Sequence, residues 1–389
     1  MSAPTPIHRT VADLTESVIP ALKDGLTTSA ASSRPSGICG FDGFIDTFIR
    51  LEQPKSMAEF GPKVAAAAGI AASYPVRHIG DKFGGNGPLF ASGLNDIHED
   101  VIDITYIGAL GRESIMPIYR EALENKTKQL YSLADPAHSD CLEFTDGKVM
   151  LSDLTACADV TLERLLECVE ADALDAELEA ADFIAAVNWG KMVNVGPICS
   201  YLAQRLGELG VEKKKVHYFM DLAEFEGRPS EDIDDLLERL KGITEQCRTM
   251  LSFNLKEAWQ MGEVFDGAFS GRKDPESVAE LAALLREKID VDRIIIHPND
   301  GAACASAAGT VYVPGPVCRE PLISTGAGDN FGAGCLTAAL RGLDDAEIIL
   351  AGNCASGHYV RSGRSASFKA MNKLLDAWAE GKLGERLPE

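Results

Sequence analysis

The sequence has few basic residues for its size. Its 389 residues include 37 Lys and Arg against 59 Asp and Glu, which gives a formal net charge of −22 at pH 7. Such an acidic chain repels phosphate backbones and anionic lipid surfaces, so nucleic acid and membranes are disfavoured as its main partners. An anionic small molecule stays compatible with it, because a single pocket can be locally positive.

Long apolar runs and paired cysteines are also missing. The longest apolar stretches, such as KVAAAAGIAA, are far shorter than the roughly 20 residues of a membrane-spanning helix. The ten cysteines never form a CxxC pair, which excludes zinc-ribbon and thioredoxin-like spacings. The first residues lack the basic start and the apolar core of a signal peptide. Scattered single cysteines are typical of a reducing compartment, and we expect a cytoplasmic protein.

Strand-like and helix-like segments alternate along most of the chain. Runs such as ADFIAAVNWG and KVHYFMDLA predict buried strands, and PICSYLAQRLGELG predicts a helix between them. The alternation predicts an α/β fold, a doubly wound and mostly parallel sheet flanked by helices. We expect residues 1–36 to form an N-terminal helical extension, in which Pro20 predicts a kink or break. Residues 37–389 would form the α/β domain.

A second, smaller β structure is predicted beside this sheet. Asp146-Gly147 stands between two alternating runs, which is a strong signal for a β-hairpin. We expect this hairpin, within residues 140–153, to form a small lid over one edge of the sheet. Residues 44–52 and 76–83 would complete the lid.

Polar residues and glycines follow several of the predicted strands. Open α/β sheets bind ligands at the carboxyl ends of their strands, so these residues are candidates for a functional site. They are Asp42, Asp46, Gly84–Gly87, Asn188, Asn254 and Asp329. We therefore expect the site at this edge of the sheet.

The stretch STGAGDNFGAGCLTAAL, residues 324–340, joins a glycine loop to a helix. Free backbone N–H groups at a helix start, with the helix dipole behind them, form an anion site. If a transferring phosphoryl group binds at Gly326–Gly328, Asp329 stands where a base can take the proton of an attacking hydroxyl. Asp is also a common helix cap, and the spacing alone leaves the two roles equally open. The stretch is one residue too long for a dinucleotide fingerprint, and it lacks the lysine of a P-loop.

The segment STGAGDNFGAG closely resembles the signature of the ribokinase-like (PfkB) carbohydrate kinases. Other segments resemble motifs of this family in the same order over residues 37–370. They are GFDGFID, FGGNGPLFASGL, YIGALGRE, SFNLKEA, IIIHPNDGA and GNCASGHYVRSG. The resemblance implies a ribokinase-like fold with a β-sheet lid. It also implies transfer of the γ-phosphoryl group of ATP to a hydroxyl of a sugar or sugar-like substrate, assisted by Mg²⁺.

The resemblance implies roles for individual residues. Asp329 would be the general base, and the backbone of Gly326, Ala327 and Gly328 would form the anion hole. The substrate-binding residues would be Asp46, Asp42, Gly84, Gly85 and Asn86. The residues that bind the nucleotide would be Asn254, Glu257, Gly301, Thr325 and Asn353. Glu257 would act on magnesium through water, because Mg²⁺ keeps part of its hydration shell.

Several of these assignments have alternatives. Between the two acids of the first motif we favour Asp46 over Asp42, because family members place this acid several residues beyond the glycine of the first strand. Either acid could instead cap a strand end. Asn254 could simply cap the following helix, and Glu257 could be a solvated acid at its start.

The residues expected to bind the substrate depart from the family pattern. The chain reads Gly87–Phe90 where many relatives have an asparagine, so that polar contact is missing or comes from Asn86. Ser324 stands where an aspartate is common. Arg112 and Lys191 would suit a phosphorylated or acidic sugar, or are surface cations. The sequence therefore defines the reaction better than the substrate.

Three functions stay open from the sequence. The first is a sugar kinase, and the second is a nucleoside kinase, in which Phe44, Phe83 or Phe90 would stack on the base. The third is a catalytically silent ligand-binding regulator that keeps the fold. The resemblance also raises two further expectations, a homodimer through the lid and a monovalent cation site near Gly363.

Overall fold

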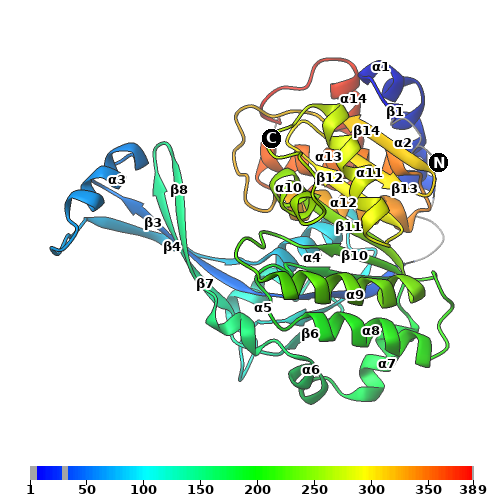
Figure 1. The fold of residues 1–389 in the computed structure, drawn as a ribbon, viewed down its shortest axis with the longest axis horizontal. Helices are drawn as coiled ribbons and strands as arrows, with labels where there is room; N and C mark the ends of the chain where they lie inside the picture. The colour runs from blue at the N-terminus through cyan, green and yellow to red at the C-terminus, as the bar shows by residue number, and fades with distance from the viewer. Residues whose placement is uncertain (1–6, 29–33, 388–389) are drawn as a thin grey trace.

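A computed structural model of the chain describes residues 7–28 and 34–387. Figure 1 shows a large body of sheet and helices, from which a smaller sheet extends to one side. The large sheet has the strand order β1-β14-β13-β12-β11-β10-β9-β2-β5-β6. Its strands are β1 (Ile7–His8), β2 (Ser36–Phe41), β5 (Asp103–Gly108), β6 (Gln129–Ser132), β9 (Phe183–Val187), β10 (His217–Asp221), β11 (Arg248–Asn254), β12 (Arg293–His297), β13 (Gly301–Ser306) and β14 (Gly309–Pro314).

The pairing of these strands confirms the predicted doubly wound, mostly parallel sheet. Every pair from β12 across to β6 is parallel. Only β13 runs antiparallel to its neighbours β12 and β14 within the described residues. The parallel order brings the carboxyl ends of β12, β11, β10, β9 and β2 to one edge.

Helices cover both faces of the large sheet (Figure 1). They are α1 (Val11–Asp13), α2 (Ile19–Thr28), α4 (Asn86–Ile97), α5 (Pro117–Leu123), α6 (Leu162–Cys168), α7 (Ala171–Glu179), α8 (Gly196–Glu208), α9 (Ser230–Gln246), α10 (Leu255–Val264), α11 (Pro275–Lys288), α12 (Ala327–Leu340), α13 (Asp345–Ser362) and α14 (Phe368–Ala379). Within residues 7–28 and 34–387, no helix combines the length and the apolar character needed to cross a membrane.

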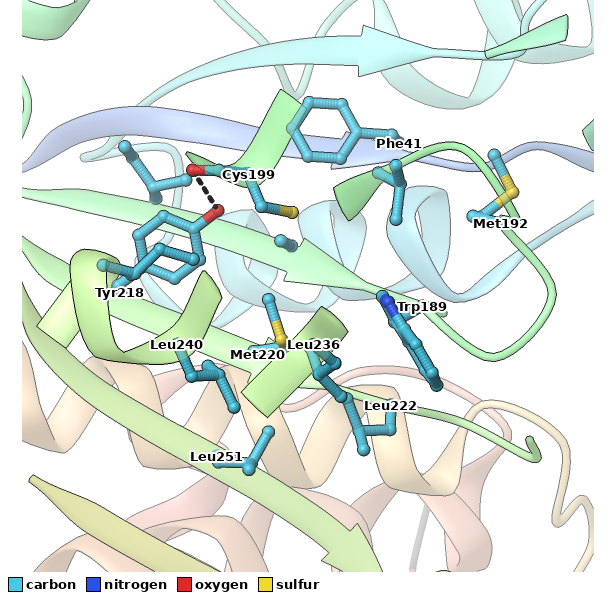
Figure 2. Packing of buried hydrophobic residues seen from close by; sticks show 14 of the residues in the cluster. Phe41, Trp189, Met192, Cys199, Tyr218, Met220, Leu222, Leu236, Leu240 and Leu251 are labelled. Atoms are coloured by element: carbon cyan, nitrogen blue, oxygen red, sulfur yellow. Dashed lines mark hydrogen bonds between the residues drawn. The ribbon is translucent and has the colours of Figure 1, made fainter. Parts of the chain in front are cut away.

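Successive residues of the strands point into two separate cores. In β10, Tyr218 and Met220 belong to one core and Phe219 to the other. Figure 2 shows the first core, where Tyr218 and Met220 lie near Leu236 and Leu240 of α9. Because strand side chains alternate between faces, both faces of the sheet are buried under helices.

The first helical segment stays helical through Pro20. A π-helical turn, Leu14–Val18, links α1 to α2 directly before this proline. The helix therefore does not break at Pro20, because the wider turn just before it accommodates the proline. Leu14, Val18 and Leu22 of this segment are buried in the second core.

The small sheet has the strand order β4-β3-β7-β8. Its strands are β3 (Phe44–Leu51), β4 (Val76–Gly84), β7 (Ala137–Phe144) and β8 (Gly147–Asp153), and α3 (Met57–Ala66) lies beside it (Figure 1). The β7–β8 hairpin turns at Asp146, whose carboxylate accepts the backbone N–H of Met57 at 2.7 Å. This contact joins the hairpin turn to α3.

Candidate active site

Polar side chains meet where the parallel strands end. Five adjacent strands contribute Asp42 after β2, Asn188 after β9, Asp221 in β10, Asn254 in β11 and His297 in β12. The N-terminal ends of α4 and α12 bring Asn86 and Asp329 to the same region, where these two side chains share a hydrogen bond. The predicted strand-end residues therefore lie together, as the parallel order requires.

Asp329 occupies the first turn of α12 and is nearly buried, with 8% exposure. Its Oδ1 accepts a hydrogen bond from the Asn86 side-chain amide at 2.9 Å. Burial raises the pKa of Asp329 well above its usual range, the Asn86 donor opposes this, and the charges of Asp221 and Asp42 add to it. The N-cap position of α12 belongs to Gly326, so Asp329 is not the helix cap.

The glycine loop before α12 needs glycine at Gly326. This residue has a φ of +91°, and a Cβ there would lie 2.8 Å from the Tyr359 hydroxyl oxygen. That hydroxyl donates to the carbonyl oxygen of Thr325 at 3.0 Å, which fixes the loop from the side of α13. A Cβ on Gly328 would meet only His297, at 3.7 Å. The loop thus opens the start of α12, where free N–H groups suit an anion.

Asp42 holds several residues of the site in place by accepting their hydrogen bonds. Its carboxylate is fully buried and accepts the backbone N–H of Asn86 at 2.9 Å, that of Gly87 at 2.7 Å and the side-chain amide of Asn188 at 2.6 Å. Burial raises the pKa of Asp42 to about 6 against the opposing effect of these donors. Asn86 therefore connects two carboxylates, since its backbone binds Asp42 and its side chain binds Asp329.

Asp46 lies on β3 of the small sheet, which contains the segments predicted to form the lid, and is also nearly buried, at 7% exposure. A Cβ on Gly84 would lie 2.5 Å from its Oδ2, so the paired glycines let the backbone approach this carboxylate closely. Burial raises the pKa of Asp46, and the charges of Lys148 and His138 oppose the shift. Gly85 is the N-cap residue of α4, beside Asp42.

Asn254 and Glu257 form a capping box at the start of α10. The Asn254 backbone N–H donates to Glu257 Oε2 at 2.9 Å, and the Glu257 N–H donates to Asn254 Oδ1 at 3.0 Å. Asn254 is therefore a helix cap, and this role is compatible with a ligand contact. Glu257 is only 3% exposed, so its description as a solvated acid is wrong. Burial and the negative charge of Asp221 raise its pKa.

The donor set at this end suits a hydrated divalent cation. Asp221 and Glu257 are acidic groups whose pKa values are both raised, mainly by burial, and a cation would offset that cost. In the described part of the chain, no three His, Cys, Asp or Glu side chains are grouped as a ready-made metal cage.

A pocket of about 340 Å³ lies between the glycine loop and α13. Four residues predicted to bind the nucleotide or the phosphate line it, namely Asn254, Ala327, Gly328 and Asn353. The remaining lining residues are His297, Pro298, Asn299, Gly315, Pro316, Cys318, Pro321, Ser324, Phe331, Ser356, Gly357 and Val360. The pocket therefore runs from the start of α12 along α13, with room for an elongated ligand.

Three residues predicted to bind the nucleotide, Glu257, Gly301 and Thr325, are not among the residues that line this pocket. Gly301 begins β13, where a Cβ would lie 2.4 Å from the Tyr312 hydroxyl oxygen. Thr325 lies at the mouth of the glycine loop, where its hydroxyl accepts a hydrogen bond from Lys148 of the lid.

The family of the chain follows from comparison with known proteins. A model of the prokaryotic ketohexokinases matches residues 14–378. The chain belongs to this family. A curated ketohexokinase from Haloferax volcanii is 25% identical over 254 residues, a match that spans 65% of this chain and 65% of that protein. The resemblance to ribokinase-like carbohydrate kinases is thereby confirmed.

Solved structures share the fold of this family member. Arabidopsis thaliana ribokinase, complexed with ribose and ATP, superposes with a TM-score of 0.62 at 16% identity and covers 88% of this chain and 99% of its own. Thermotoga maritima ribokinase gives 0.58 at 14% identity, covering 89% and 98%. Sinorhizobium meliloti adenosine kinase gives 0.57 at 16% identity, covering 84% and 94%. The ribokinase-like fold is confirmed, and sugar and nucleoside kinases share it.

Sequence reasoning gives no role to one polar residue of the site, Asn188, and leaves two others, Asp221 and His297, out of its candidates. Asn188 was noted at a strand end but given no role, although it has a φ of +63° and donates to Asp42. Its Oδ1 is buried without a partner. Asp221 and His297 end β10 and β12, and His297 stacks on Phe331 with ring centroids 4.4 Å apart. Their positions near the ends of predicted strands are the available signal.

Proposed function

We propose that the protein is an ATP-dependent ketohexokinase, which transfers the γ-phosphoryl group of ATP to a hydroxyl of a ketohexose. The observation that carries this proposal is the double role of Asn86. It joins Asp42 on the sugar side to Asp329, which lies in the first turn of α12, the helix whose start would form the anion site. Family membership supports a ketohexose among the sugars.

The transfer step assigns a function to Asp329. The sugar hydroxyl oxygen attacks the γ-phosphorus of ATP, and its bond to phosphorus forms as the bond to the β,γ-bridging oxygen breaks. The electron pair of the broken bond stays on ADP, and the hydroxyl proton passes to the Asp329 carboxylate. The raised pKa of Asp329 makes it a stronger acceptor than an exposed aspartate. The backbone N–H groups of Gly326, Ala327 and Gly328 would hold the phosphoryl oxygens.

The sugar would be held by residues of both the sheet and the lid. Asp42 already accepts three donors from the protein, so its role is to fix Asn86 and Asn188 in place. Asp46 approaches from the lid against Gly84. We assign the substrate hydroxyl contacts to Asp46, to the open Oδ1 of Asn188 and to the backbone of the paired glycines, with Asp42 behind them.

Mg²⁺, when bound with the nucleotide, would offset the charge of the phosphates. Glu257 would hold it through water, and Asn254 would stand at the phosphate end of the pocket with Thr325 beside it. Asn353, whose side-chain amide donates to Val313 O at 3.2 Å, would face the nucleotide further along α13. The monovalent cation near Gly363 stays a prediction.

A neutral sugar fits the site better than a phosphorylated or acidic one. The two cations considered for an anionic substrate are paired elsewhere, Arg112 with Asp159 at 2.8 Å and Lys191 with Glu224 at 3.3 Å. The sugar side also holds two carboxylates, which would repel a second anion.

The alternative of a nucleoside kinase lacks a free aromatic platform among the three residues considered for it. Phe90 is buried and stacked on Phe219, with centroids 5.2 Å apart, and Phe44 is buried in the first core. Phe83 contacts Tyr119 edge-on at 6.5 Å. One motive for the regulator hypothesis, the asparagine missing after the paired glycines, is weakened, because Asn86 places a side-chain amide there beside Asp329.

A homodimer through the lid is part of the proposal. The lid exposes large apolar side chains, which monomeric proteins rarely gather on one projection. They are Val76 at 54% exposure, Ile79 at 47%, Met150 at 42% and Leu151 at 56%.

The proposed function is tested by measuring ADP release with a coupled assay. The panel contains D-fructose, D-tagatose and L-sorbose, then D-glucose, D-ribose, fructose 6-phosphate and adenosine, each with Mg²⁺ or with excess EDTA. We expect turnover with a ketohexose, and its loss with EDTA. Turnover with adenosine alone would instead support the nucleoside kinase. No ADP release with any member would support the regulator.

A further inference from the structure

The lid strand β8 carries a lysine on the face that holds Asp46. Antiparallel pairing sets Lys148 opposite Glu143 and Ser152 opposite Ser139, and parallel pairing sets Ser139 opposite Asp46. Directly opposite residues share a face, and so do residues two apart on one strand. Lys148 and Asp46 therefore project from the same side of the lid.

The hairpin that carries Lys148 is fixed by its own contacts. The Asp146 carboxylate accepts the backbone N–H groups of Met57 at 2.7 Å and Ala58 at 3.3 Å, which joins the turn to α3. Glu143, the cross-strand neighbour of Lys148, forms an ion pair with Arg50 at 3.1 Å. Glu143 therefore has a cation of its own, whereas the Lys148 ammonium is hydrogen-bonded to the large body.

The Lys148 ammonium reaches the glycine loop of the large body. It donates to the hydroxyl of Thr325, the residue directly before Gly326. Its positive charge also lowers the pKa of Asp46. A single ammonium thus contacts the anion site through Thr325, and its charge also acts on Asp46 on the sugar side, although the two sides come from different sheets.

We propose that Lys148 is a further catalytic residue of the phosphoryl transfer, which the lid places against the transferring phosphoryl group. This inference rests on the proposed kinase function. As the sugar oxygen bonds to phosphorus and the bond to ADP breaks, negative charge spreads over the three phosphoryl oxygens. Lys148 stays protonated, donates to one of these oxygens in place of Thr325, and exchanges no proton or electron.

The site has a physical need for such a cation. Its carboxylates at Asp42, Asp46 and Asp329 surround the place where the phosphoryl group and the sugar would meet, and each has a raised pKa. An ammonium that arrives on the lid adds positive charge when the sugar is enclosed and water is excluded. Charge placed in advance against the transition state acts on the chemical step more than on ground-state binding.

The test compares three variants with the wild-type enzyme on its best ketohexose. Lys148→Met removes the charge, Lys148→Arg keeps it, and Lys63→Met makes the same change at an exposed lysine of α3. Thermal unfolding of each variant checks the fold. We expect Lys148→Met to lose about 10²- to 10³-fold in kcat, the range found when one donor to a developing oxyanion is removed. Lys148→Arg should retain most of the activity, and Lys63→Met should match wild type.

A second measurement separates charge stabilisation from a structural role of the lid. Binding of ADP with fluoroaluminate, a mimic of the transferring phosphoryl group, is measured by calorimetry in the presence of the sugar. Lys148→Met should weaken this complex by a factor similar to its loss in kcat, while ADP alone binds as in wild type. A folded Lys148→Met variant with unchanged kcat, or one that only raises KM for the sugar, would overturn the inference. A wild-type protein without kinase activity would instead refute the proposed function.

Discussion

Replacing Asn86 by Ala should move the acid limb of the pH–rate profile to higher pH. The side-chain amide of Asn86 donates to Asp329 at 2.9 Å, and this bond favours the ionised carboxylate. Removing the donor raises the pKa of Asp329 further. Because the base must be ionised to accept a proton, the variant needs a higher pH to reach the same fraction of active enzyme.

The size of the shift follows from the worth of the hydrogen bond. A bond to a charged group contributes about 1.5–3 kcal/mol net. One pKa unit equals about 1.4 kcal/mol, so the pKa of Asp329 should rise by about 1–2 units in the variant. The backbone N–H of Asn86 still donates to Asp42 after the change, so the hydrogen bonds that hold the sugar side in place are kept.

The assay is kcat/KM for the sugar measured across pH, with wild type, Asn86→Ala and Asn95→Ala. Asn95 lies on the same helix, α4, and donates to the carboxylate of Asp100 at 2.6 Å, so its replacement removes a comparable bond outside the site. Asn95→Ala should leave the profile in place. An acid limb that stays at the wild-type pH in Asn86→Ala would refute the assignment of Asp329 as the base.

Three further changes test the base, the buried acid and the loop. Asp329→Asn should lower kcat by at least about 10²-fold, as loss of a general base does, while calorimetry shows unchanged ADP binding; retained turnover would contradict the assignment. Burial raises the pKa of Asp42 to about 6, so the folded state holds the extra proton and wild type loses stability as pH rises from about 4 to 6. The free energy of unfolding in urea should fall by about 3 kcal/mol more in wild type than in Asp42→Asn over this pH range. Curves of this free energy against pH that run parallel for the two proteins would contradict the prediction. Gly326→Ala should lower Tm, because φ is +91° and Tyr359 lies 2.8 Å from the new Cβ, whereas Gly328→Ala should not; equal Tm values would count against this account of the loop.

The sequence predicts the large sheet well because its strands are local apolar runs. Periodicity identifies β9, β10 and β11, and the Asp146-Gly147 signal locates the lid hairpin. The strand β13, GAACAS, escapes this reading because its small residues have little strand propensity of their own. They form a strand because β12 and β14 pair with them on both sides.

The sequence predicts individual residues of the site but not the contacts between them. The glycine loop and Asp329 are visible in one local stretch, and so is the Asn254–Glu257 cap. That Glu257 is buried, and that the charge of Asp221 raises its pKa, depends on the neighbouring strands β10 and β11. The bridge from Asn86 to Asp329 joins residues 243 positions apart, and no local pattern encodes it.

The local charge at the site has a different origin from the net charge of the chain. A net charge of −22 leaves room for a locally positive pocket, yet none of the residues lining the described pocket is Lys or Arg. Its positive potential comes from the backbone N–H groups at the start of α12, which keep their partial charge at any pH. These groups suit an anion but cannot match the full charge of a triphosphate. We therefore expect the balance to come from a divalent cation near Glu257, bound with the nucleotide, and from Lys148, which already contacts Thr325 of the glycine loop.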